Sequence, residues 1–366
     1  MKVGVVRLKR LAEKYKVLYS KKIKGEISGI TPPDTLITGS YPYLNLGILS
    51  SEELYKEKPK TIEEFIKQRL SFVNVIRKTY AYIGKRKDPF LEKYKEDLLS
   101  IRELDIEAKV RKPNVVFTSI GPFLNVKAKK IDIYGNPRIP KEVDYIINES
   151  LRAKEAIWYL YNKGYSDSYL ARVLSLGFVG GYINRKLVPS KNAITAVYSI
   201  LIEKLEKEIK NYKQVEKSYV FYKKYFGNEF FVLFLPGTFR FELLEAFKPK
   251  SIYNPYSYTI YGKDEEYGGF YASKLSVLEK LREIKRQANI VVFRIVTEEY
   301  YVPLGVWVVR EGVKYSDLVF KGKTYEALEF IKKELEKRKI NLNKWMKYSS
   351  ILKNLFFQRK LKDFII

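Results

Sequence analysis

Apolar residues recur along the chain with two spacings, one typical of helices and one typical of strands. Between residues 61 and 84 they follow one helical face, and Thr61 with Glu64 forms a capping box, so a helix is predicted from Thr61 to Gly84. From Lys141 the pattern is again helical, with Gly164 expected just after the helix end. Further helices are predicted over residues 166–177, 190–213, 272–287, 324–338 and 343–356.

Strands are expected where apolar and β-branched residues cluster between Gly and Pro residues. Turns flanking short strands are predicted for residues 28–49, and strands interrupted at Gly121-Pro122 for residues 113–133. A loop rich in Tyr and Gly, residues 249–271, is expected to join two parts of the chain. Further strands are predicted over residues 217–226, 229–236, 288–296 and 305–311. Together the elements predict an α+β fold, with mixed sheets covered by helices and a short C-terminal helical tail.

The charge of the chain is strongly basic. Its 366 residues include 69 Lys and Arg against 42 Asp and Glu, which gives a formal net charge of +27 and a pI of about 9.7. Such an excess favours polyanionic partners, either nucleic acid or an acidic membrane surface, although the Lys-rich surface of a thermophilic protein has the same composition. The sequence contains no apolar run long enough to span a membrane and no signal-peptide pattern at its basic start, so a cytoplasmic, nucleoid-associated protein is expected.

Two residue types are missing altogether. Without Cys there are no disulfides, thiolate nucleophiles or cysteine zinc sites, and without His there are no Ser-His triads. No cofactor is therefore expected, and Mg²⁺ enters only under the alternative of a carboxylate-metal nuclease. Glu242 and Glu245 are three residues apart and are the candidates for one helix face in that alternative.

A basic segment with the sequence YINRKLVPSKNAIT carries the cations Arg185, Lys186 and Lys191 just before a helix expected to begin near Ser190. A helix N-terminus has free N–H groups and a positive dipole end, so this arrangement suits a phosphate of a DNA backbone or a nucleotide. A solvated basic turn capped by Ser190 is the alternative interpretation.

Farther along, NPYSYTIYGKDEEYGGFY interleaves tyrosine with loop residues, a pattern typical of core packing, interface burial or stacking on the bases of a single strand.

The last nine residues, QRKLKDFII, combine apolar and basic side chains. If one helical turn forms there, Leu361, Phe364 and Ile365 stand at positions i, i+3 and i+4, and Gln358 precedes them. Burying three such side chains contributes about 5–8 kcal/mol before the cost of ordering the tail, which suits a reversible tether. This ending resembles the motif by which DNA-replication and repair proteins dock on the sliding clamp, with Ile365 where a second aromatic residue is usual. A tail helix folding onto the chain itself is the alternative.

Several longer stretches resemble one family. They are TPPDTLITGSYPYLNLGIL, NPRIPKEVD, NRKLVPSKNAITAV, GGFYASKLSVLEKLREIKRQANIVVFRI and EEYYVPLGVWVVREGV. Together with the clamp-motif-like ending they resemble the archaeal Nre DNA-repair family. The resemblance implies an N-terminal domain over residues 1–255, a C-terminal domain over 256–356 and a clamp-binding tail over 357–366. Many members also carry a four-cysteine zinc motif, which this chain cannot form, and Asn192 stands where an aromatic residue is expected.

Taken together, these features predict a DNA-repair factor that binds the DNA backbone through a basic surface and is recruited by its C-terminal motif to the sliding clamp, the archaeal PCNA. The predicted clamp-binding residues are Gln358, Leu361, Phe364 and Ile365, and the predicted phosphate-binding residues are Arg185, Lys186, Ser190 and Lys191. The alternative is an enzyme, either a carboxylate-metal nuclease or a nucleotide-using enzyme acting on damaged DNA. No membrane partner is expected.

Overall fold

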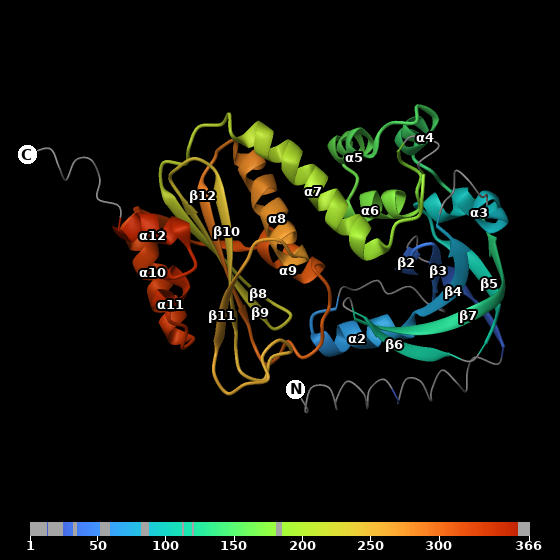
Figure 1. Ribbon diagram of the computed structural model, residues 1–366, viewed down its shortest axis with the longest axis horizontal. Helices are drawn as coiled ribbons and strands as arrows, with labels where there is room; N and C mark the ends of the chain where they lie inside the picture. Colours follow the sequence, from blue (N-terminus) through green and yellow to red (C-terminus); the bar gives the residue numbers. More distant parts are fainter. Residues whose placement is uncertain are drawn as a thin grey trace, which may run out of the picture. The chain divides into compact units, whose positions relative to one another are not determined.

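The computed structural model describes residues 13, 25–31, 35–51, 59–81, 88–111, 113–118, 121–180 and 185–357. The chain divides into two compact units, an N-terminal unit up to Leu201 and a C-terminal unit from Ile202 onward, with the division inside helix α7 (Ser190–Ile209) (Figure 1). The predicted clamp-binding residues Gln358, Leu361, Phe364 and Ile365 lie outside the described residues.

A mixed sheet organises the N-terminal unit. Within the described residues it has seven strands in the order β1-β5-β7-β4-β3-β2, with β6 paired to β7; β4 and β7 run parallel, and the other pairs are antiparallel. The strands are β1 (Glu26–Thr31), β2 (Thr35–Ser40), β3 (Tyr43–Ser50), β4 (Val73–Tyr80), β5 (Leu104–Val110), β6 (Asn114–Thr118) and β7 (Gly121–Tyr134). Side chains alternate along β5, so its even-numbered residues are buried and its odd-numbered residues are exposed.

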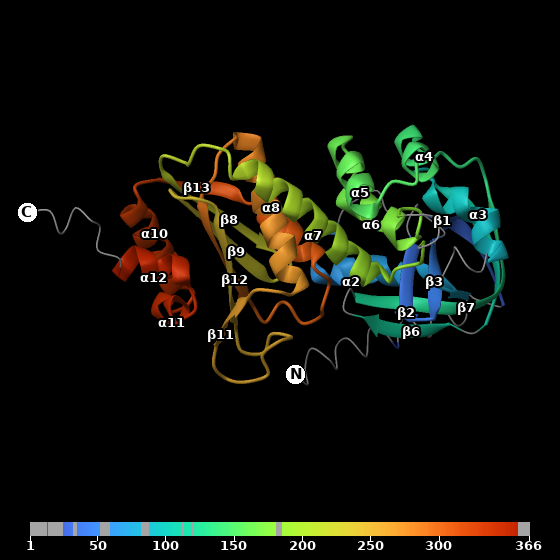
Figure 2. The same cartoon turned by 45° about the horizontal axis from the view of Figure 1, so that its top comes forward.

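The helices of this unit differ in what they pack against. Helix α2 packs on β7, whereas α4, α5 and α6 follow one another as a separate helical group (Figure 2). The bounds are α2 (Ile62–Ser71), α3 (Pro89–Leu99), α4 (Lys141–Asn148), α5 (Ala153–Asn162), α6 (Asp167–Ser175) and the first part of α7.

The helix predicted over residues 61–84 is wrong beyond Ser71. Its start is confirmed, because the Thr61–Glu64 capping box forms at α2. From Val73, however, the chain is strand β4, which pairs with β3 on one side and β7 on the other. The apolar spacing there also fits a fully buried strand, and the β-branched residues Val73, Val75 and Ile76 favour that state once two neighbours are available for pairing.

The helix predicted from Lys141 to Gly164 is interrupted. Helix α4 ends at Asn148, Ser150 takes a left-handed backbone conformation with φ 48°, and α5 begins at Ala153. The predicted end is confirmed, because Gly164 follows the α5 cap residue with φ 89°.

A second mixed sheet organises the C-terminal unit. Its six strands within the described residues have the order β11-β10-β12-β9-β8-β13, and β10 and β12 run parallel. The strands are β8 (Ser218–Tyr225), β9 (Asn228–Leu235), β10 (Arg240–Phe247), β11 (Ile260–Asp264), β12 (Asn289–Val296) and β13 (Asp317–Gly322). The strands predicted over 217–226, 229–236 and 288–296 are thereby confirmed, whereas the predicted loop over 249–271 also contains β11 and the start of a helix.

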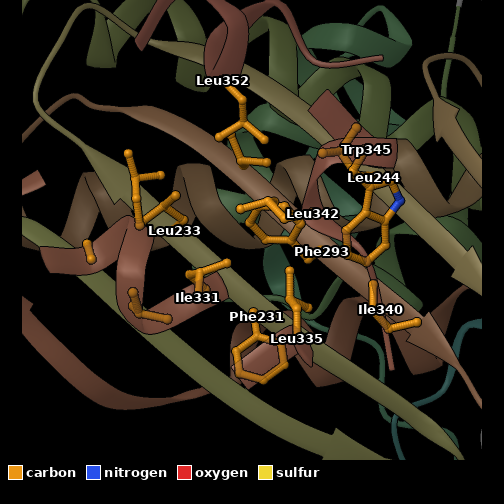
Figure 3. Packing of buried hydrophobic residues seen from close by; sticks show 14 of the residues in the cluster. Phe231, Leu233, Leu244, Phe293, Ile331, Leu335, Ile340, Leu342, Trp345 and Leu352 are labelled. Atoms are coloured by element: carbon orange, nitrogen blue, oxygen red, sulfur yellow. The ribbon is translucent and has the colours of Figure 1, made fainter. Parts of the chain in front are cut away.

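Helices cover both faces of this second sheet, with α10, α11 and α12 on one face and α8 and α9 on the other (Figure 1). Figure 3 shows the core under the first set, where Phe231 and Phe293 from the sheet meet Leu335 and Trp345 from the helices. Trp345 is fully buried, and its indole N–H donates to the Glu245 carbonyl at 2.9 Å. The helices are α8 (Gly268–Ile284), α9 (Trp307–Lys314), α10 (Thr324–Lys337), α11 (Leu342–Met346) and α12 (Ser350–Phe357).

The strand predicted over residues 305–311 is wrong, because this segment forms helix α9. Its valines at 308, 309 and 313 are buried, and the helix packs on α8 and on strands β8 and β9. Gly312 makes this close approach possible, since a Cβ atom at that position would collide with the Phe230 ring. Packing in three dimensions therefore decides against the strand propensity of a valine-rich run.

The α+β class with mixed, helix-covered sheets is confirmed. Among the residues that the structure describes, no helix is long and apolar enough to cross a membrane.

Candidate nucleic-acid interface

Three segments that are far apart in the sequence meet at one end of the first sheet. They are the turn between β2 and β3, the end of β4, and the segment 185–191 that leads into α7. The Ala81 N–H donates to the Pro42 carbonyl at 2.9 Å, and the Leu187 N–H donates to the Ala81 carbonyl at 2.7 Å. The Tyr41 hydroxyl donates to the Leu187 carbonyl at 3.0 Å. These hydrogen bonds fix the basic segment against the turn.

Cations and tyrosine rings alternate on this joined surface. The Lys186 ammonium lies 5.1 Å from the centroid of the Tyr41 ring, and the Lys78 ammonium lies 5.0 Å from that of Tyr43. Tyr43 also meets Tyr80 edge-on, with 5.6 Å between ring centroids. Tyr41 and Tyr43 are 42% and 52% exposed, so both rings and both ammonium groups are open to solvent. Each exposed cation–π contact contributes about 0.5–1 kcal/mol, enough to orient a flexible lysine.

The four residues predicted to bind phosphate have different surroundings. Lys186 and Lys191 are exposed, and Lys191 stands in the first turn of α7. Ser190 is turned into the protein, where its hydroxyl accepts a hydrogen bond from the Ile37 N–H at 2.9 Å. The Arg185 guanidinium donates to the Ile147 carbonyl at 2.9 Å and so satisfies the end of α4. Phosphate binding by this segment stays a prediction, and the two lysines are its solvent-facing cations.

Sequence reasoning missed Tyr41, Tyr43 and Lys78 as parts of this surface. The two tyrosines lie in the stretch 28–49, for which only turns flanking short strands were predicted, and Lys78 lies in the predicted helix that is in fact strand β4. The sequence Tyr41-Pro42-Tyr43 was the available signal, because Pro favours a turn and turns run over the protein surface. We call the five residues Tyr41, Tyr43, Lys78, Lys186 and Lys191 the basic–aromatic surface.

The basic–aromatic surface has the chemistry of a nucleic-acid contact without base specificity. Lysine ammonium groups attract phosphates as point charges and displace counterions, and exposed rings stack on bases of any sequence. The positive end of the α7 dipole adds to the attraction at Lys191.

Two family models match almost the whole chain. The model described as "Archaeal Nre, N-terminal" matches residues 7–254, and the model described as "Archaeal Nre, C-terminal" matches residues 259–364. The chain belongs to the archaeal Nre family. The two Nre models meet near residue 255, whereas the compact units of the structure divide at Leu201, inside α7.

Three relatives named as DNA repair proteins match over most of their length. A protein of Archaeoglobus fulgidus named DNA repair protein NreA is 35% identical over 341 residues, which cover 87% of either chain. The Haloferax volcanii protein of the same name is 28% identical over 357 residues, covering 87% of this chain and 84% of its own. A second Archaeoglobus fulgidus protein, DNA repair protein NreB, is 30% identical over 379 residues, covering 94% and 93%. No solved structure matches the Nre chain.

The carboxylates proposed for metal binding are not on one helix face. Glu242 and Glu245 lie on strand β10, where residues three apart point to opposite faces of the sheet. Glu245 faces α8 and pairs with Arg294 at 2.7 Å, and burial raises the pKa of the Glu245 carboxyl against the lowering effect of Arg294. The shared-face interpretation is therefore wrong. Among the described residues of this Nre chain, no group of three or more acidic side chains is placed to hold a metal ion.

Glu242 instead anchors the last described helix. Its carboxylate accepts hydrogen bonds from the Ser350 N–H at 2.9 Å and the Ser350 hydroxyl at 2.7 Å, and from the Ser349 hydroxyl. Lys263 lies 3.4 Å away. A carboxylate at a helix N-terminus both caps free N–H groups and interacts favourably with the dipole. Glu242 thus fixes α12, the helix that ends immediately before Gln358.

Glu242→Gln is expected to lower the free energy of unfolding of the C-terminal unit by about 1.5–3 kcal/mol at neutral pH. Burial raises the pKa of Glu242, but the hydrogen bonds from Ser349 and Ser350 outweigh it, so the pKa lies below its ordinary value of 4.5. A lowered pKa means that the charged group stabilises the fold above the ordinary value and loses that effect as the pH falls. The difference between wild type and variant, followed by thermal unfolding, should therefore shrink below about pH 4. Glu329→Gln, at an exposed position of α10, is the control that should leave the melting temperature unchanged.

Proposed function

We propose that this chain is a DNA-repair factor that binds DNA through the basic–aromatic surface and is recruited to the sliding clamp by its C-terminal residues. Three relatives at 28–35% identity are named DNA repair proteins, which supports a role in repair. The observation that carries DNA binding is the pairing of Lys186 with Tyr41 and of Lys78 with Tyr43 on one surface.

The proposed contact is directed at the DNA backbone. Lysines hold phosphates without a fixed geometry, so affinity should depend steeply on salt and little on sequence. The formal charge of +27 adds a long-range attraction that speeds association with any polyanion.

Clamp recruitment is proposed for Gln358, Leu361, Phe364 and Ile365. Support comes from the motif itself and from its point of attachment, because it begins directly after α12, whose first turn is tied to Glu242. A tether that starts at a fixed helix keeps the folded body close to the clamp, so weak binding at each site adds up to a strong joint affinity for clamp-loaded DNA.

The double variant Lys186→Gln, Lys191→Gln tests the DNA-binding proposal. If both ammonium groups contact phosphates, the slope of log affinity against log salt should flatten by about 2 for duplex DNA, with a correspondingly weaker affinity at low salt. Fluorescence anisotropy of a labelled duplex over a salt series measures both quantities.

A matched control removes the same charge elsewhere. Lys332→Gln, Lys333→Gln changes two exposed lysines of α10 and should leave the salt slope within error of the wild type. Equal slopes for the two double variants would contradict the assignment of the basic–aromatic surface, since general charge alone would then explain binding.

A further inference from the structure

The loop between β10 and β11, residues 248–259, exposes an unusual set of aromatic side chains. Tyr253, Tyr256 and Tyr258 are 47%, 55% and 61% exposed, and Pro255 and Ser257 between them are exposed as well. Leaving large rings in water gives up burial that would otherwise stabilise the fold. We call this segment, which belongs to the C-terminal unit, the tyrosine loop.

A buried asparagine holds the tyrosine loop in one conformation. Asn254 is fully buried, and its amide NH₂ donates to the carbonyls of Phe247 and Tyr258, each at 2.7 Å. Its side-chain oxygen accepts from the Tyr256 N–H at 3.0 Å. The Asn254 side chain therefore spans the loop and forms hydrogen bonds with the backbone of Tyr256 and Tyr258, the two residues with the most exposed rings of the loop. The loop is preorganised, so a ligand that binds it meets little entropic cost.

The two most exposed rings form a stacked pair. The centroids of Tyr256 and Tyr258 are 5.5 Å apart and their planes are inclined by only 12°. The Tyr253 ring contacts the rings of Tyr300 and of Phe247, the last residue of β10, so this part of the loop packs against the end of the sheet. A pair of parallel rings whose backbone is held by Asn254 presents aromatic surface in the geometry that a stacked base requires.

The charge of the tyrosine loop favours a polyanion. It contains Lys248 and Lys250 and no acidic residue, and neither lysine belongs to an ion pair within the described part of the chain. A protein-binding hot spot would also use tyrosine, but a segment that begins with two unpaired cations and continues with exposed rings matches a nucleic-acid strand, whose bases stack while its phosphates are neutralised.

We infer that the tyrosine loop binds unpaired nucleotides of a DNA strand by stacking bases on Tyr256 and Tyr258, with Lys248 and Lys250 beside the phosphates. Bases in an intact duplex are stacked on each other and offer no free face, so this surface selects single-stranded segments such as those exposed at damaged or replicating DNA. The inference takes its ligand class from the proposed DNA-binding function and adds a second, separate surface to it.

The test compares Tyr256→Ser, Tyr258→Ser with wild type in the full-length chain. The probes are a labelled oligothymidylate of about 15 nucleotides and a duplex of the same length, both followed by anisotropy. Loss of both rings should weaken single-strand binding by about 10- to 100-fold and leave duplex binding unchanged. The salt slope should also stay constant, because stacking displaces no counterions. Tyr325→Ser, which removes a 62% exposed tyrosine from α10 of the same unit, should change neither affinity.

Further variants separate stacking from other roles. Tyr256→Phe, Tyr258→Phe keeps the rings and should retain single-strand affinity, and a melting curve checks that all variants are folded. Unchanged single-strand affinity in the serine variant overturns the inference, as does an equal loss in the phenylalanine variant, which would point to the hydroxyls. If the wild type binds duplex but not oligothymidylate, the inference about the tyrosine loop is wrong and the proposed DNA-binding function still stands. If the wild type binds neither probe, the proposed DNA-binding function fails too.

Discussion

Ending the chain at Phe357 is expected to abolish binding to the sliding clamp of the same organism, while the affinity of the remaining protein for DNA stays within a factor of about 2. The removed residues 358–366 contain the whole proposed clamp motif, and the basic–aromatic surface lies in a different compact unit. Calorimetric titration of the clamp with full-length and shortened protein measures the first effect, and anisotropy with labelled DNA measures the second.

The size of the clamp effect follows from the apolar residues of the tail. Leu361, Phe364 and Ile365 together contribute about 5–8 kcal/mol of gross burial, from which the cost of ordering the tail is subtracted, so these side chains alone support a dissociation constant no tighter than about 1 μM. Leu361→Ala, Phe364→Ala in the full-length chain should lose binding as completely as the truncation. Lys362→Ala, which changes a tail residue outside the motif, should retain it. Normal clamp binding by the truncated protein would refute the recruitment proposal.

Arg294→Leu is expected to destabilise the C-terminal unit by about 3–5 kcal/mol, one of the largest effects available to a single substitution in this chain. Arg294 lies on β12 and is 7% exposed. It pairs with Glu245 at 2.7 Å, and its Nε donates to Asn228 at 2.9 Å. Removing the guanidinium leaves the Glu245 carboxylate buried without its cation, and the cost of that unpaired charge is the main contribution.

A double variant distinguishes the unpaired charge from lost packing. Arg294→Leu, Glu245→Leu removes both charges and should be more stable than Arg294→Leu alone. Lys224→Met breaks the exposed ion pair with Glu299, in which both side chains are more than half exposed, and should cost less than about 1 kcal/mol. Denaturant unfolding of each variant gives the three values. If the double variant were less stable than Arg294→Leu, the buried-charge explanation would be wrong.

Local signals predicted those elements whose boundaries are set by neighbouring residues. The Thr61–Glu64 box starts α2, and Gly164 and Gly177 follow the ends of α5 and α6 with positive φ. The capping box and the glycine helix ends depend on hydrogen bonds and backbone angles within one turn, so no tertiary contact is needed to form them.

The errors occurred where pairing or packing at long range decided the state. Val73–Tyr80 is a strand because β3 and β7 flank it, and Trp307–Lys314 is a helix because α8 and the sheet bury its valines. Glu242 and Glu245 were placed on one face only because β10 was not recognised as a strand. In each case the sequence period was compatible with two structures, and partners distant in the sequence selected one.

For the candidate site as well, some features could be predicted from the sequence and others depended on the tertiary structure. The sequence by itself determined the basic charge, the exclusion of cysteine and histidine chemistry, the Nre resemblance and the predicted phosphate segment around Lys186 and Lys191. Only the tertiary structure decided that Lys186 lies over Tyr41 and that Asn254 holds Tyr256 and Tyr258 in a stacked pair. The reason is physical: charge and composition add up residue by residue, whereas a surface requires the chain to bring particular side chains within a few ångströms of each other.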